Sequence, residues 1–188
     1  GEVRLTITGD QGRLPTDPMQ NVATVAALKV IELAGAKTGV ELKLHKGLPL
    51  GSGLGSSAAS AASAAIATNE ALGNPLTRNE LIEAGRAGEA LACGSPHPDN
   101  VVPALLGGIL LMVEDADQLH LLKLKRPETL SVAVVIPELE VRTADARAVL
   151  PTHVPIADAV FTAGRVGLLV GALEQNNLEL LKVALEDR

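Results

Sequence analysis

The most informative stretch of the sequence is Leu48-Pro49-Leu50-Gly51-Ser52-Gly53-Leu54-Gly55-Ser56-Ser57-Ala58-Ala59. Glycine at positions 51, 53 and 55 lets the backbone adopt positive φ and approach a ligand without Cβ atoms in the way. The alanine-rich residues that follow predict a helix whose first turn offers free N–H groups and the positive end of the helix dipole. The combination indicates a phosphate cradle. A glycine-rich turn that only permits close helix packing is the alternative.

Three better-known glycine motifs do not fit this stretch. A Walker A loop needs a Lys-Ser/Thr pair after its last glycine, whereas Gly55 is followed by Ser56 and Ser57. The dinucleotide-binding fingerprint has its third glycine one residue later, and the G-x-S-x-G elbow of hydrolases is absent. A phosphate ligand would therefore be held by a loop of a different type from these three.

Composition excludes several classes of protein. The 188 residues include one aromatic side chain, Phe161, so recognition by ring stacking is excluded as a main mode. The net charge of -6 has the wrong sign for nucleic acid, which leaves backbone N–H groups, a few cations or a divalent metal to hold a polyanion. The single cysteine, Cys93, fits a reducing compartment. We expect no secretory signal and no membrane partner, because no apolar run approaches the ~20 residues of a membrane span.

Periodicity predicts an α+β protein in which helices cover one face of a sheet. Asn21 is expected to cap the first helix, and Thr77 with Glu80 forms a capping box for the third. Residues 46–55 and 94–98 are expected to be loops. The predicted strands are 3–8, 40–44, 109–113, 119–124 and 131–136, and the predicted helices are 21–34, 56–72, 77–92, 143–150, 156–174 and 178–185.

Residues 49–59 resemble the P-x-x-x-G-L-G-S-S-A-A signature of the GHMP kinases. Together with His97-Pro98-Asp99-Asn100 and residues 143–151, they resemble the homoserine kinase family in particular. The resemblance covers essentially the whole chain. It implies a GHMP kinase fold, with a ribosomal protein S5 domain 2-like ATP-binding lobe over 1–128 and the beginning of an α/β C-terminal lobe over 129–188. It also implies that the chain is an internal portion of the family's length and is poorly active alone.

The resemblance further implies ATP and Mg²⁺ as cofactors and L-homoserine as the substrate, in threonine biosynthesis. The location would be the cytoplasm, or the plastid stroma in a plant, and a homodimer is expected. The metal ligands would be Ser57 and Glu89. The residues expected at the nucleotide are Asn21, at the adenine edge, and Lys46, Pro49, Gly51, Ser52, Gly53, Leu54, Gly55, Ser56 and Ser57.

In the acceptor pocket the resemblance places His97, Asp99, Asn100 and Arg147 at the substrate, and Asn100, Thr143 and Arg147 at the reacting groups. Arg147 would pair with the substrate carboxylate, for which its planar fork is suited. No residue stands out as a general base, and phosphoryl transfer asks mainly for positioning and charge neutralisation.

Each assignment has a structural alternative. Glu89 would otherwise be a solvated residue on a helix, His97 a loop residue, and Asn21 and Asp99 only helix caps. Thr143 and Arg147 are also ordinary helix residues. At the level of function, another GHMP small-molecule kinase and a non-catalytic protein that binds nucleotide or amino acid stay open.

Overall fold

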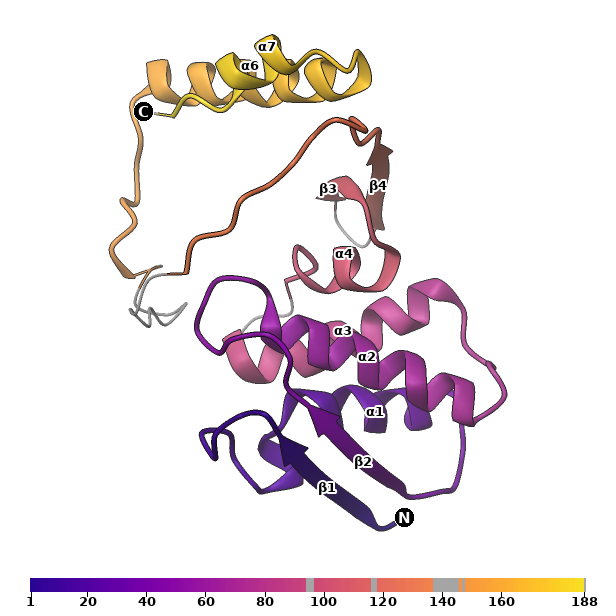
Figure 1. Ribbon diagram of the computed structural model, residues 1–188. Coiled ribbons are helices and arrows are strands. Elements are labelled where there is room, and N and C mark those ends of the chain that lie inside the picture. Colours follow the sequence, from indigo (N-terminus) through magenta and orange to yellow (C-terminus); the bar gives the residue numbers. More distant parts are fainter. Residues whose placement is uncertain (94–96, 116–117, 137–145, 147, 188) are drawn as a thin grey trace. The chain divides into compact units, whose positions relative to one another are not determined.

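The computed structural model describes residues 1–93, 97–115, 118–136, 146 and 148–187. These residues divide into two compact units, one built mainly from Gly1–Gly107 and the other from residues that follow Gly107. The elements of both are labelled in Figure 1. The lobe boundary expected between residues 128 and 129 stays a prediction.

Two parallel strands, β1 (Val3–Thr8) and β2 (Val40–His45), form the sheet of the first unit. They pair in register from Val3 opposite Val40 to Thr8 opposite His45, and every second side chain is exposed. The predicted alternation is therefore confirmed. Helices α1 (Val22–Leu33) and α2 (Ser56–Ala71) cover one face, where three of their alanines pack beside Val40, Leu42 and Leu44 of β2.

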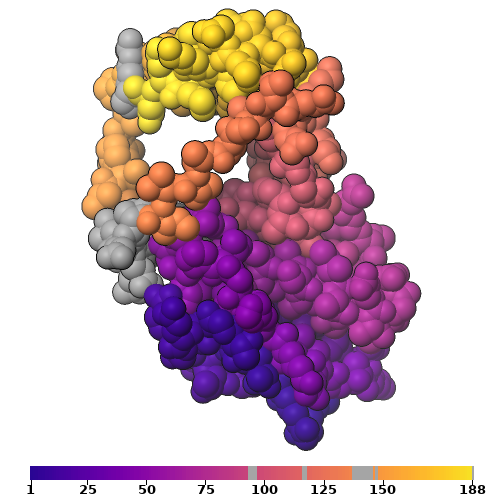
Figure 2. Space-filling model, in the orientation of Figure 1, coloured from indigo at the N-terminus to yellow at the C-terminus, as the bar shows by residue number. Residues whose placement is uncertain are grey.

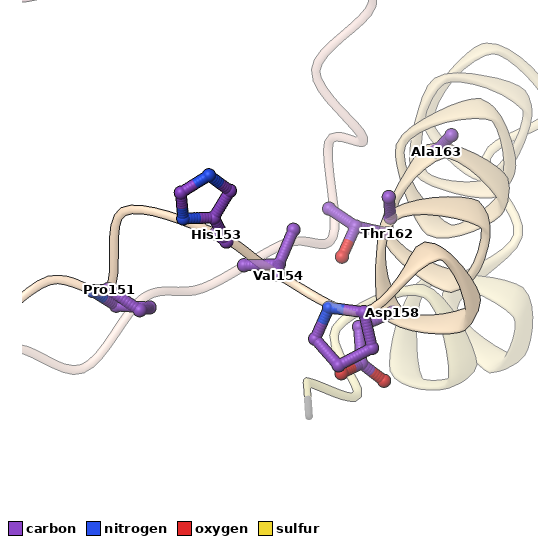
Figure 3. A pocket seen from close by; sticks show the side chains of 8 residues that line it. Pro151, His153, Val154, Asp158, Thr162 and Ala163 are labelled. Atoms are coloured by element: carbon purple, nitrogen blue, oxygen red, sulfur yellow. The ribbon is translucent and has the colours of Figure 1, made fainter.

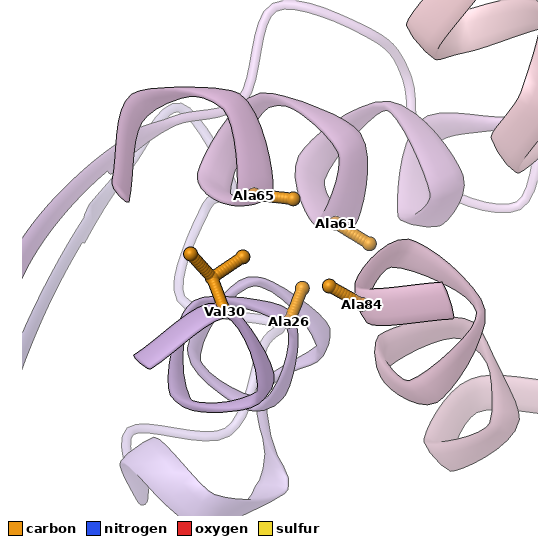
Figure 4. Close-up of a cluster of buried hydrophobic side chains, with 5 residues drawn as sticks. All are labelled: Ala26, Val30, Ala61, Ala65 and Ala84. Atoms are coloured by element: carbon orange, nitrogen blue, oxygen red, sulfur yellow. The ribbon is translucent and has the colours of Figure 1, made fainter. Parts of the chain in front are cut away.

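Helices α1, α2 and α3 (Arg78–Cys93) meet in a core of small side chains, shown in Figure 4. Its fully buried members are Ala26, Val30, Ala61, Ala65 and Ala84. Gly88 of α3 brings the helices closest. A Cβ there would lie 2.5 Å from the carbonyl oxygen of Val22 and 3.1 Å from the Cβ of Ala61. The absence of a side chain at Gly88 thus lets α3 lie directly against α1 and α2.

The predicted helix caps of this unit are confirmed. Asn21 Oδ1 accepts the N–H of Ala23 at 3.0 Å, immediately after a short 3-10 helix, η1 (Pro18–Gln20). Thr77 donates its N–H to Glu80 Oε2 at 2.7 Å, and Glu80 returns its own N–H to Thr77 Oγ1 at 3.4 Å. These bonds fix where α1 and α3 begin. The short helix α4 (Val101–Leu106) then packs against α2 and α3.

The second unit pairs two strands with two helices. Strands β3 (Ile109–Asp115) and β4 (Gln118–Leu124) are antiparallel, and their register runs from Ile109 opposite Leu124 to Asp115 opposite Gln118. Helices α6 (Ile156–Glu174) and α7 (Leu178–Ala184) follow. The core of the unit consists of Leu124, Ala172, Leu173 and Leu181. The strands of the described chain therefore form two separate pairs, whereas one sheet was expected.

The strand predicted over 131–136 is wrong. These residues join no sheet of the described chain, and Val132 and Val135 are 78% and 88% exposed. In Figure 2 they belong to the narrow extended segment coloured orange. An apolar run favours extended backbone, but a strand exists only where a neighbouring strand supplies hydrogen bonds. Most of the helix predicted over 143–150 lies outside the described residues.

Helix α6 bears on the expectation that the chain has no membrane partner, which stays a prediction. Within the described ranges it is the one helix that is long and apolar enough to cross a membrane. Its most apolar 18 residues have a mean hydropathy of 1.6, and 11% of them are buried. Length and composition alone are weak evidence, because core helices of soluble proteins meet the same criteria.

Candidate active site

The loop between β2 and α2 has the conformation that its glycines predicted. Gly51, Gly53 and Gly55 have φ of +67°, +74° and +68°, in the left-handed region that other residues adopt only at a cost. A Cβ on Gly53 would meet nothing within 4 Å, so this glycine serves the backbone conformation and faces open space. The backbone is thus exposed to a ligand on this side.

The hydroxyl groups near the loop are used to hold the loop itself. Ser52 Oγ donates to the carbonyl oxygen of Pro49 at 2.9 Å, and Ser56 Oγ donates to that of Leu48 at 3.2 Å. Gly55 is the N-cap residue of α2 and provides no side-chain cap. The first-turn N–H groups of a helix have no partner within the helix, so they are the donors available to an anion here.

Lys46 lies beneath this loop. The residue is 8% exposed, and its Nζ donates to the carbonyl oxygen of Ser56 at 2.6 Å and to Ser60 Oγ at 2.7 Å. Burial lowers the pKa of the Lys46 ammonium below its usual value, and the negative charge of Glu89 offsets part of that shift. Lys46, which was predicted to lie at the nucleotide, therefore uses its ammonium group in hydrogen bonds to the N-terminal part of α2.

Glu89 and Ser57 are brought together, as the metal assignment requires. Ser57 Oγ donates to Glu89 Oε1 at 2.9 Å, and Glu89 is 4% exposed. The reading of Glu89 as a solvated residue is therefore wrong. Its burial follows from its neighbour, because Gly88 holds this turn of α3 against α1 and α2.

A hydroxyl and a carboxylate oxygen are hard donors of the kind that Mg²⁺ accepts. Across the described ranges, no group of three or more His, Cys, Asp or Glu side chains is arranged to hold a metal ion. Ser57 and Glu89 would therefore supply few ligands, and a cation here would depend on oxygens of a bound phosphate. This is the usual way in which Mg²⁺ is held in nucleotide sites.

Asn100 borders the phosphate loop. A Cβ placed on Gly55 would lie 3.4 Å from Asn100 Oδ1, so the Asn100 amide stands next to the start of α2. Asp99 Oδ1 accepts the backbone N–H of Asn100 at 3.1 Å, and both side chains are exposed. His97 is half-buried. Two elements that are 45 residues apart in the sequence are thus adjacent in the first unit.

The remaining predicted site residues are less informative. Asn21 is buried and caps α1, so its capping role is confirmed and its adenine role stays a prediction. Thr143 and Arg147 lie outside the described residues.

Sequence reasoning missed two residues that shape the site. Gly88 and Ser60 determine where Glu89 and Lys46 lie. Signals for both were present: Gly88 follows Gly85 at helical spacing, which is typical of close helix packing, and Ser60 lies one turn after Ser56.

A separate hollow of about 800 Å³ lies in the second unit (Figure 3). Its walls are mainly apolar, with His153, Asp158 and Thr162 as the polar lining residues. His153 Nδ1 and Thr152 Oγ1 are hydrogen-bonded at 3.0 Å. None of the predicted site residues that the structure describes lines this hollow.

Comparison with known proteins bears on the resemblance to the GHMP kinases. Residues 21–108 match the family model for the GHMP kinases N terminal domain. The chain is 43% identical to the homoserine kinase of Chloroherpeton thalassium over 96% of this chain and 58% of that relative. It is 42% identical to the homoserine kinase of Chlorobaculum tepidum over 97% of this chain and 58% of that relative. The crystal structure of homoserine kinase from Cytophaga hutchinsonii has a TM-score of 0.89 and 41% identity, over 100% of this chain and 59% of that one.

The chain thus spans less than three fifths of the length of these relatives. The matched family region begins at the N-cap of α1 and includes the phosphate loop, Glu89 and Asn100. Residues 21–108 therefore form a domain that matches the N-terminal domain of the GHMP kinases.

Proposed function

We propose that the complete protein is a homoserine kinase, which transfers the γ-phosphoryl group of ATP to the side-chain hydroxyl of L-homoserine. The observation that carries the proposal is the convergence on the start of α2: a positive-φ glycine loop, the Ser57–Glu89 pair at 2.9 Å and Asn100 beside Gly55. The names of the relatives support the choice of acceptor.

In the proposed reaction the N–H groups at the start of α2 bind the phosphates of ATP. Ser57 and Glu89 would hold Mg²⁺, which, when bound, neutralises phosphate charge and so favours transfer. Asn100, which lies next to Gly55, would orient the acceptor hydroxyl near the phosphates. The acceptor oxygen forms the new bond to phosphorus, the bond to ADP breaks, and the hydroxyl proton leaves to solvent or phosphate. Residues 143 and 147 are proposed to complete the acceptor site.

Further proposals follow from the same function. The product would be a phosphate ester of homoserine, which fits a step toward threonine. A reducing cytoplasmic or plastid location and a homodimer are proposed on the single cysteine and on the resemblance alone.

The test is ADP release by the complete purified protein with Mg²⁺, ATP and one acceptor alcohol at a time. Turnover with homoserine, and little with mevalonate, galactose or shikimate, is the expected result. Turnover with another of these alcohols would favour a different GHMP kinase. ATP binding without turnover on any acceptor would favour a non-catalytic binding protein.

A matched pair of variants tests the site itself. Glu89→Gln removes the buried carboxylate charge and should reduce turnover by about a hundredfold, since a ligand to the cation is lost. Glu83→Gln makes the same chemical change on the same helix at an exposed ion pair with Lys29, and should leave turnover unchanged. Equal activity of the two variants would remove Glu89 from the mechanism.

A further inference from the structure

Lys46 joins the two ends of the phosphate loop. It is the first residue after β2, and its backbone N–H donates to the carbonyl oxygen of Thr8 at 2.8 Å, which fixes it to β1. Its Nζ reaches Ser56, the first residue of α2, at 2.6 Å. The sheet end and the helix start are thus linked across a loop whose three glycines would otherwise give it many conformations.

The direction of the hydrogen bonds from Lys46 Nζ indicates that Lys46 does not bind phosphate directly. In a helix the N–H groups point toward the N-terminus and the carbonyl groups toward the C-terminus. Lys46 Nζ bonds to a carbonyl oxygen, and to Ser60 Oγ one turn further along. Its charge therefore lies on the inner side of the first turn, away from the side on which the free N–H groups would meet an anion.

The charge itself is unfavourable in the absence of a ligand. A cation at the positive end of a helix opposes the helix dipole, and burial removes it from water. An alternative side chain such as methionine would fill the space without that cost. The negative charge of Glu89 offsets part of this cost, and negative charge that arrives at the start of α2 adds to that compensation.

We propose that Lys46 is a positioning residue of the phosphate site: its buried ammonium fixes the loop onto α2 and adds a positive charge beneath the first turn, which raises phosphate affinity without touching the phosphate. The inference rests on the proposed function, because it takes the anion to be the phosphate chain of a nucleotide.

The test compares Lys46→Met with Lys43→Met in the complete protein. Lys43 is an exposed lysine of β2, so its variant loses the same charge without the loop contacts. The dissociation constants of ATP and AMP are measured by calorimetry. Lys46→Met should weaken ATP binding roughly tenfold to thirtyfold and AMP binding much less, since the lost charge acts on the phosphate chain. Lys43→Met should bind both nucleotides as the wild type does.

Stability separates this role from a purely structural one. Lys46→Met should melt close to the wild-type temperature, because the cost of the buried cation is gone while Glu89 loses a compensating charge, and these two effects oppose each other. Ser60 Oγ still donates to the Ser56 carbonyl oxygen at 3.0 Å. Should Lys46→Met fail to fold, Lys46→Arg takes its place; it keeps the charge and should keep the ratio of ATP to AMP affinity within about threefold.

The outcomes are distinguishable from those of the proposed function. A wild-type protein that binds no ATP overturns both. If the wild-type protein binds ATP, two results overturn only the role of Lys46. One is a Lys46→Met variant whose ratio of ATP affinity to AMP affinity equals that of the wild type. The other is a folded Lys46→Arg variant that loses the wild-type ratio.

Discussion

Replacement of Gly88 by alanine tests how the metal pair is positioned. The new Cβ would lie 2.5 Å from the Val22 carbonyl oxygen, 3.1 Å from Ala61 Cβ and 3.2 Å from Ala26 Cβ. Ordinary contacts of a Cβ begin near 3.4 Å, and the nearest atom belongs to backbone, so no side chain can turn away. Helix α3 must withdraw from α1 and α2, which pulls Glu89 from Ser57.

Two opposing terms set the size of the effect on stability. Alanine gains about 1 kcal/mol over glycine in a helix interior. Overpacking of a well-packed contact costs about 1–3 kcal/mol, and the backbone oxygen places this case at the upper end. The net loss in unfolding free energy is therefore about 1–2 kcal/mol, or roughly 2–8 °C in melting temperature for a domain of this size.

The assay is urea unfolding of the wild type, Gly88→Ala and Gly164→Ala. A Cβ on Gly164 in α6 would meet nothing within 4 Å, so that variant should gain about 0.5–1 kcal/mol from helix propensity alone. A Gly88→Ala protein as stable as the wild type, with unchanged dependence of its activity on Mg²⁺, would refute the reasoning.

Three further predictions concern the same unit. Ser57→Ala should raise the Mg²⁺ concentration for half-maximal turnover about tenfold, measured by metal titration of the complete protein, because one oxygen donor is lost. Thr77→Ala should cost about 1 kcal/mol at neutral pH. The bonds from Thr77 hold the pKa of Glu80 below its usual value, so the capping box is fully stabilising above that range and weakens as pH falls through the lowered pKa. The gap between the urea midpoints of wild type and Thr77→Ala should thus narrow toward about pH 3. Gly53→Ala should lower the melting temperature through its φ of +74°, at a cost of about 1–2 kcal/mol, without any clash.

Features set by nearby residues could be predicted from the sequence. The alternation in β1, the glycine loop and the caps at Asn21 and Thr77 all depend on groups within a few residues of one another. The stability of each of these features depends on residues close to it in the sequence, so the local sequence pattern is enough to predict it. The resemblance to the GHMP kinases added the pairing of Ser57 with Glu89, which the residues alone made improbable.

Features set by distant residues could not be predicted. Glu89 is buried because Gly88 contacts Val22, which lies 66 positions earlier in the chain. Lys46 bonds to Ser60 because the loop folds back on α2. Residues 131–136 have the composition of a central strand but lack a partner strand in the described chain. In each case the local pattern allows several outcomes and tertiary contacts choose one.

The charges around the start of α2 explain why the ligand should arrive as a metal–phosphate complex. Lys46 and Glu89 are both buried and of opposite sign, and the negative charge of Glu89 counters the effect of burial on the pKa of Lys46. A cation alone would satisfy Glu89 but would add positive charge beside the helix terminus and Lys46. A phosphate alone would satisfy the N–H groups and Lys46 but would approach the Glu89 carboxylate. Only the pair satisfies both, so metal and phosphate should each raise the affinity for the other by the same factor. On the proposed function, a chain with a net charge of -6 would thereby bind a polyanion through locally placed groups rather than through overall attraction.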